Sequence, residues 1–158
     1  MRIETIEQGK IHVQQGLSDG VTCPCCQQHC QKYDRHLYSD PVAALCRLYR
    51  LTGGEPGIFK HMRDIGTPKT GGGDFSKLRH WGLISAAPKE LHNNPKTKTS
   101  GMWALTEKGR LFVDGAILLP RKCMVFNNHN YGFIGDQISV LDALKEDFDY
   151  AKETGKLL

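Results

Sequence analysis

The side chains best suited to chemistry are cysteines, four of which fall within eight positions near the N-terminus. Cys23 and Cys26 have the C-x2-C spacing that presents two thiolates to one tetrahedral metal ion. No apolar N-terminal stretch resembles an export signal, so clustered cysteines indicate metal binding more than disulfides. We expect one structural Zn²⁺, with the ligands Cys23, Cys26, Cys30 and His36.

Other interpretations of this cluster remain open. His29 is the first alternative ligand, and Cys25 is the second, because adjacent Cys25 and Cys26 are awkward ligands for one ion. The C-P-C-C run also resembles a thioredoxin-type dithiol. That interpretation needs a βαβ context, whereas the sequence that follows is predicted to be helical. Free thiols without a role are the third possibility.

Positive charge is concentrated in the middle of the sequence. Residues 69–110 carry eight basic and three acidic side chains, a surplus of five in a chain with a net charge of +4. Basic segments attract phosphate backbones because binding releases condensed counterions. An ordinary solvated charged face is the alternative interpretation.

The composition narrows the class of protein. The 158 residues suit one domain with a small appendage. No apolar run approaches the ~20 residues of a membrane helix, so we expect no membrane association and a cytoplasmic location. We find no phosphate loop, nucleophile elbow or paired carboxylates, and no acid, base and nucleophile to assemble. We therefore expect no enzymatic activity.

These residues must be positioned by the predicted elements. Asp40, as N-cap, and Pro41 begin a helix whose buried face includes Cys46, which we expect to be a core residue. Three helices are predicted first, over 40–52, over 56–65, and over 74–81 with Asp74 as N-cap. A strand from Leu83, a polar loop over 87–101 and a strand over 102–105 follow. A helix capped by Thr106 then closes at Gly115.

Three short helices followed by a strand, a basic loop and a second strand predict a winged helix-turn-helix. In that fold the third helix enters the major groove and the hairpin forms the wing. The expected class is α+β. The predicted parts are an N-terminal arm with a strand near 11–13 (1–22), a Cys/His zinc loop (23–39), the winged helix-turn-helix (40–115), and a C-terminal β-hairpin plus helix (116–158).

The C-terminal part is predicted in less detail. Pro120 indicates an edge strand over 117–126, followed by a turn over 127–130 and a partner strand over 131–134. Ser139 and Asp142 form the capping box of one last helix. The final eight residues are expected to fray.

This fold predicts where a DNA-binding surface would lie. The third helix supplies one arginine and neither Asn nor Gln, so we expect weak base readout. The predicted DNA-binding residues are Lys69, Ser76, Lys77, Arg79, His80, Lys96 and Lys98. The alternative is a module that docks onto a host protein complex.

Several segments also resemble a group of uncharacterised small winged-helix proteins of tailed phages and prophages. The matching pieces are CPCC, AALCRLYRL, DFSKLRHWGLI, MWALTEKGRLFVDG, and LPRKCMVFNN followed by ISVLDALKEDFDY. KLRHWGLI and ALTEKG are generic to winged helices, and the last pair is more specific. The resemblance implies a phage or prophage source, hence a bacterial host cell, a DNA-binding or regulatory role, and a metal-type cysteine cluster, but no established activity.

Overall fold

The computed structural model describes residues 2–66, 74–88 and 101–157. The chain is α+β, as predicted. Its helices are α1 (Ile6–Gly16), α2 (Ser39–Thr52), α3 (Met62–Ile65), the 3₁₀ helix η1 (Phe75–Trp81), α4 (Glu107–Val113), α5 (Val140–Leu144) and α6 (Tyr150–Thr154). Its strands are β1 (Val21–Thr22), β2 (His29–Cys30), β3 (Tyr33–His36), β4 (Phe59–His61), β5 (Ile84–Ala86), β6 (Met102–Leu105), β7 (Leu119–Phe126) and β8 (His129–Ile138).

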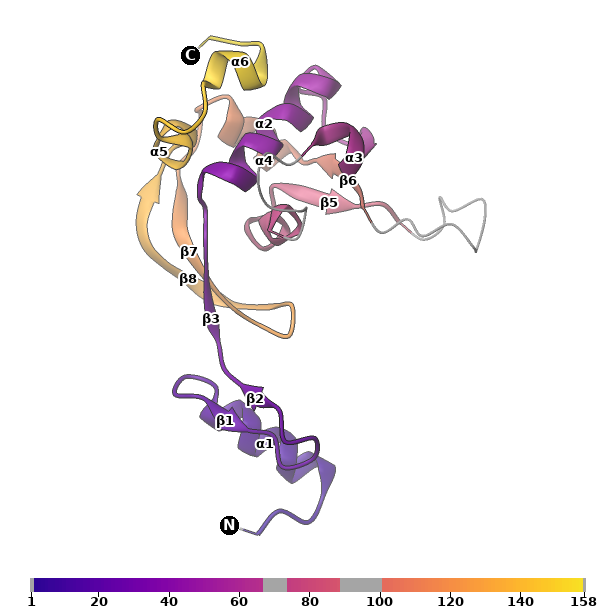
Figure 1. Ribbon diagram of the computed structural model, residues 1–158, viewed down its shortest axis with the longest axis vertical. Helices are drawn as coiled ribbons and strands as arrows, with labels where there is room; N and C mark the ends of the chain where they lie inside the picture. Colours follow the sequence, from indigo (N-terminus) through magenta and orange to yellow (C-terminus); the bar gives the residue numbers. More distant parts are fainter. Residues whose placement is uncertain (1, 67–73, 89–100, 158) are drawn as a thin grey trace.

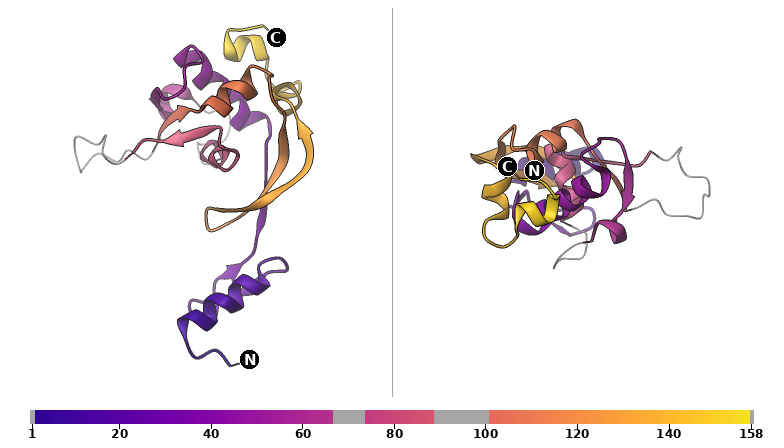
Figure 2. Two further views of the ribbon diagram at one scale, coloured as in Figure 1. Left: turned by 180° about the vertical axis from the view of Figure 1, so that it is seen from behind. Right: turned by 90° about the horizontal axis from the view of Figure 1, so that it is seen from above.

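The molecule is elongated and has a small N-terminal part beside a larger body (Figures 1 and 2). Helix α1 and the β1–β2 hairpin form the N-terminal module, which we define as residues 2–32. Strand β3 runs from this module into the body, residues 33–157 (Figure 1). Within the described residues the strands form three antiparallel sheets, ordered β1–β2, β3–β7–β8 and β4–β6–β5.

Helix α2 is the centre of the body's core, as its apolar periodicity predicted. Leu45 and Cys46 are fully buried on it. The helix begins two residues earlier than expected, with Tyr38 instead of Asp40 as N-cap, and Asp40 lies buried inside the first turn. Gly53 ends it in the left-handed conformation that glycine adopts without strain.

The helix predicted over 56–65 is wrong in its first half. Residues Phe59–His61 form strand β4, which pairs with β6, and only Met62–Ile65 are helical. Ile58, which precedes the strand, is 39% exposed. Pairing with a distant strand satisfies the backbone here and overrides a short local pattern that fits either element.

The third predicted helix is confirmed in place, although it is a 3₁₀ helix. Phe75, Leu78 and Trp81 are buried on it, and Gly82 ends it with φ 75°. The Asp74 side chain makes no capping hydrogen bond, because its carboxylate accepts a hydrogen bond from the Tyr38 hydroxyl. That contact joins the start of η1 to the start of α2.

The strand over 102–105 and the helix after Thr106 are also confirmed. The Thr106 hydroxyl accepts a hydrogen bond from the Gly109 N–H at 3.0 Å and so caps α4. A Cβ built on Gly109 would lie 2.2 Å from the Leu83 carbonyl oxygen. Only glycine therefore allows α4 to pack this closely on the chain entering β5.

The prediction of an edge strand around Pro120 is wrong. Strand β7 is the central strand of the sheet β3–β7–β8. The register shifts between Pro120 and Lys122, and such an irregularity accommodates a residue that has no N–H. The Trp81 indole donates to the Pro120 carbonyl at 2.8 Å, which ties this sheet to η1.

The predicted last helix is two short helices. The Ser139–Asp142 capping box is present, but α5 ends at Lys145, which has φ 55°. Asp149 then caps α6. The expected fraying of residues 151–158 is wrong for α6, because Glu153 is buried and pairs with Arg47 at 2.7 Å.

The N-terminal arm, predicted to be irregular with a strand near 11–13, contains helix α1. Thr5 and Gln8 form a capping box at its start. This Thr-x-x-Gln pattern is a local sequence signal for the beginning of a helix. Leu17 and Gly9 are the buried residues of this module within residues 2–32. Among the described residues, no helix has the length and apolarity to cross a bilayer.

Candidate functional site

Two groups of side chains could carry chemistry, and the first is the cysteine hairpin, residues 21–30. Strands β1 and β2 pair Val21 with Cys30. Cys23 donates its N–H to the Gln28 carbonyl at 2.8 Å, and Gln27 donates to the Cys23 carbonyl at 2.8 Å. Gln27 has φ 62°, which closes the turn. The hairpin thus holds the C-x2-C pair in a tight loop.

Backbone N–H groups stabilise the Cys23 thiolate. The N–H of Cys26, and then that of Cys25, are the main groups that lower the pKa of Cys23 below its ordinary value. Hydrogen bonds to the charged form of a group favour that form. Because the thiolate is the form that binds metal, this loop geometry favours metal binding at Cys23.

Cys30 lies close to the same two thiols. Burial is the main factor that raises the pKa of Cys30, followed by the charges of Cys23 and Cys26. Those interactions require the three sulfur atoms to be near one another. Cys25 also contributes to the lowered pKa of Cys23, and its sulfur lies 3.4 Å from the position of a Cβ built on Gly9 of α1.

The two histidines considered as ligands are placed elsewhere. Successive side chains of a strand point to opposite faces, so His29 faces away from Cys30. Its ring covers Gly20 and lies 3.1 Å from Gln31. His36 pairs with Lys122 across β3 and β7, at the far end of an extended strand. The structure therefore does not bring the predicted ligand His36 to the cysteines, because β3 carries it into the body.

The four thiols of the cysteine hairpin lie in one short loop, but they do not surround a common metal position. Across residues 2–66, 74–88 and 101–157, no three side chains of His, Cys, Asp or Glu are arranged to hold a metal. The donor set itself suits Zn²⁺, since closed sites of three or four cysteines are common structural sites. The exposed side chains of Cys25 and Cys26 have space to rotate.

The second group, which we call the basic cluster, consists of like charges from three elements. Its members are Arg35 on β3, Lys77, Arg79 and His80 on η1, and His129 on β8. Burial, then Arg35 and Arg79, lower the pKa of Lys77, whereas Asp74 acts in the opposite direction. Arg35, Lys77 and Arg79 are therefore held near one another despite the repulsion between their charges.

His80 is the most constrained member of the basic cluster. Burial, then the charges of Arg79, Lys77, Arg35 and His129, lower its pKa below the ordinary value. Its Nε2 atom is buried and has no hydrogen-bond partner among the described residues. Asn130 donates to the His80 carbonyl at 3.3 Å, which joins β8 to the end of η1.

The basic cluster lacks acidic counter-ions where it is most exposed. Arg35 and Arg79 are exposed, and neither forms an ion pair with any acidic side chain of the described residues. Three other arginines of the body, Arg47, Arg110 and Arg121, are paired with carboxylates, for example Arg121 with Asp136 at 2.8 Å, whereas Arg50 and Arg63 form no ion pair with a described acidic side chain. An unpaired cationic surface of this kind favours an anionic partner.

Only some of the predicted DNA-binding side chains are exposed to solvent. Arg79 is exposed, whereas Ser76, Lys77 and His80 are half-buried, and β3 and the β7–β8 hairpin contact η1 on this side. Lys69, Lys96 and Lys98 lie outside the described residues. The structure adds Arg35 and His129 to the group, and sequence spacing alone carries no signal for them.

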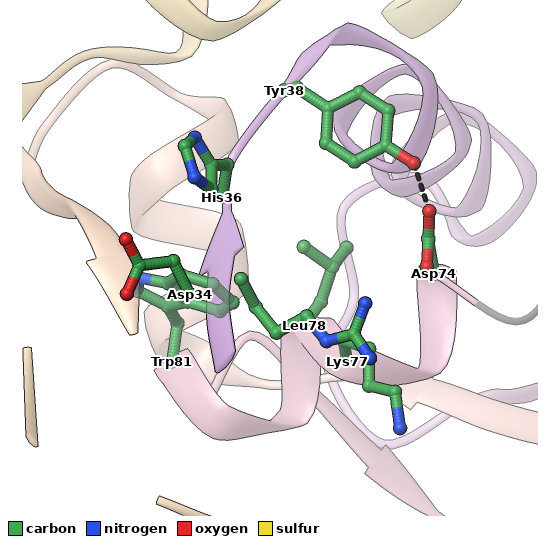
Figure 3. Close-up of a pocket in the computed structure, with 8 residues that line it drawn as sticks. Asp34, His36, Tyr38, Asp74, Lys77, Leu78 and Trp81 are labelled. Carbon is green, nitrogen blue, oxygen red and sulfur yellow. Dashed lines mark hydrogen bonds between the residues drawn. The ribbon is translucent and has the colours of Figure 1, made fainter. Parts of the chain in front are cut away.

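A cavity of about 270 Å³ separates β3 from η1 (Figure 3). Its lining includes Asp34, His36, Asp74 and Lys77, above the buried Leu78 and Trp81. Figure 3 shows Asp74 turned toward Tyr38, Lys77 on the same side of the cavity as Asp74, and Asp34 and Trp81 across it. Asp34 and Asp74 therefore share this cavity with Arg35 and Lys77, two members of the basic cluster.

Comparison with known proteins yields no relative. No family model matches the chain, and no curated protein or solved structure is significantly similar to it. Function must therefore be inferred from the side chains themselves.

Proposed function

We propose that this protein is a phage or prophage regulator that binds double-stranded DNA through a winged helix-turn-helix and is not an enzyme. Helices α2, α3 and η1 are the three helices of that motif, and strands β4, β6 and β5 are its small sheet. The wing then comprises the segment between β5 and β6, most of which lies outside the described residues.

The observation that carries this proposal is the basic cluster. Helix η1 corresponds to the helix that contacts DNA in such folds, and its exposed Arg79 lacks an acidic partner among the described residues. Lys77 and Arg35 extend the positive surface onto β3. Because β3 partly covers η1, phosphate contacts contribute more here than deep insertion into the groove, and sequence preference is weak.

A salt titration of binding to random-sequence duplex DNA tests the proposal. The affinity should fall steeply as salt rises, because each phosphate contact releases counterions. Arg79→Gln and Lys98→Gln should each weaken binding and lower the salt slope by about 1. Lys152→Gln, at an exposed position of α6, is the matched control. Absence of duplex binding by the wild type at low salt would refute the proposal.

We further propose a structural Zn²⁺ in the N-terminal module. Cys23, Cys26 and Cys30 would hold it, with Cys25 in place of His36 as the fourth ligand. The adjacency of Cys25 and Cys26 disfavours this pair, but Cys25 is the remaining thiol of the hairpin and interacts with Cys23. Four protein ligands leave no open position, so the ion supplies folding energy and no catalysis.

A second candidate function is docking onto a host protein complex of transcription or antiviral defence. Strand β8 lies at the edge of its sheet, and Tyr131, Phe133 and Ile134 expose 36%, 42% and 45% of their surface. Exposed apolar edge strands are sites of strand addition. Ile134→Ser would weaken such docking and leave the salt-dependent DNA affinity unchanged, whereas Phe133 is unsuitable for this test because its ring contacts Trp81 of η1.

A further inference from the structure

A second cavity of similar volume lies where β3, η1 and the β7–β8 turn meet. Its volume is about 280 Å³, and its polar lining includes Arg35, Lys77 and Asn128, beside Tyr33 and Phe126. The acidic side chains of the neighbouring cavity, Asp34 and Asp74, do not line this one. Two cations therefore face a cavity whose described walls contain no carboxylate.

The donors of this cavity are fixed by three separate elements. Arg35 lies opposite Cys123 in the register between β3 and β7, and the Cys123 side chain is buried in the core. Asn128 occupies the tight turn with φ 62°. The Lys77 ammonium donates to the Asn128 side-chain oxygen at 3.1 Å, which directs it toward the turn.

Many N–H groups remain available for a ligand. An ammonium group has three N–H donors and a guanidinium group has five. Within the described residues, Asn128 is the acceptor for the Lys77 ammonium, and no acceptor is found for the Arg35 guanidinium. The two cations also repel each other. A tetrahedral oxyanion between them would accept hydrogen bonds from both and remove that repulsion.

We propose that this cavity binds one phosphate group of a nucleic-acid backbone, with Arg35, Lys77 and the Asn128 amide as its donors. The identity of the phosphate's source rests on the proposed function. The neighbouring Arg79 extends the positive surface beyond one phosphate, which suits a chain of phosphates better than a single free ion. The backbone would then pass over β3 and the β7–β8 turn beside η1.

The first experiment tests the cavity without DNA. The melting temperature of the full chain is measured in inorganic phosphate and in chloride at equal ionic strength. A ligand that binds only the folded state raises the melting temperature. Wild type and Lys152→Gln should be stabilised by phosphate, whereas Arg35→Gln should lose most of that shift. An equal shift in Arg35→Gln would mean adventitious anion binding and would overturn the site.

The second experiment tests the source of the phosphate. Arg35→Gln should lower the salt slope of duplex binding by about 1, as expected when one phosphate contact is lost. If its slope and affinity equal those of wild type, the site is refuted while the proposed function stands. If phosphate stabilises the protein through Arg35 but wild type does not bind duplex DNA, the proposed function fails and with it the nucleic-acid source.

A second variant covers the case in which Arg35→Gln is misfolded. Asn128→Asp keeps a residue that tolerates the left-handed turn conformation, and it places a carboxylate beside the Lys77 ammonium. We expect it to lose the phosphate-dependent shift and to weaken duplex binding. Retention of both properties by a folded Asn128→Asp protein would overturn the proposal.

Discussion

The N-terminal module and the body bury their side chains in different ways. The body has one continuous core that includes Leu45, Phe75, Trp81 and Phe112. In the module, residues 2–32, Leu17 and Gly9 are the buried residues. A unit that buries so little apolar surface needs another source of folding energy, which a metal or disulfides commonly supply in small units. The comparison indicates that the module depends on its cysteines.

The cysteines themselves differ between the two parts. Burial raises the pKa of Cys46 to about 12 and that of Cys123 to about 11, so both remain neutral thiols in the core. In the module, backbone N–H groups lower the pKa of Cys23. The same residue type is thus an apolar filler in one part and a potential ligand in the other, because its surroundings set its charge.

Loss of the metal should have the largest effect and should be confined to the module. Structural zinc sites in small peptides bind with roughly 10–16 kcal/mol. Wild type and Cys46→Ala should each carry about one zinc per chain, and Cys23→Ser and Cys26→Ser should carry none. Amide exchange after chelation should show opening of residues 2–32 only. Wild type without metal, or simultaneous unfolding of the body, would contradict the comparison.

A cavity in the core should destabilise the body and leave the module intact. Leu78, on the buried face of η1, is 1% exposed, so Leu78→Ala should lower the free energy of unfolding by ~2–5 kcal/mol. Urea denaturation measures this change. Leu141→Ala, at a position that is 49% exposed, is the matched control and should change little. A similar loss in both variants would show that η1 does not cover the core.

Loss of the cap should have a smaller effect, within the module alone. Thr5 accepts a hydrogen bond from the Gln8 N–H at 3.1 Å, so Thr5→Ala should destabilise α1 by ~1 kcal/mol. Faster amide exchange in α1 would report this change, with no shift in the urea midpoint of the body. Ser18→Ala, at an exposed position after the helix, should leave both unchanged.

The smallest effect concerns pH and the basic cluster. Because the pKa of His80 is lowered in the folded state, the unfolded state binds the proton more readily. Its contribution to stability is present above the ordinary pKa of about 6.5 and is lost as pH falls toward the folded value. Unfolding of wild type and His80→Gln at several pH values should show a shallower acid decline in the variant. Parallel curves would exclude this role of His80.

The sequence alone determined the elements that local contacts dictate. The stripe on α2, the cap at Thr106 and the buried face of η1 depend on residues three or four apart, so periodicity and capping signals were sufficient. The C-x2-C pair is equally local, because its N–H groups come from the same turn. The capping box at Thr5 is also a local signal, although α1 lacks the apolar stripe that marks a buried helix.

Only the tertiary structure decided the features that depend on distant segments. Strand β4 exists because β6 pairs with it, and β7 is central because β3 and β8 cover both its edges. The same pairing carries His36 away from the cysteines and brings Arg35 to Lys77. Strand pairing joins residues of any sequence separation, so a single sequence contains no local signal for which charges will meet.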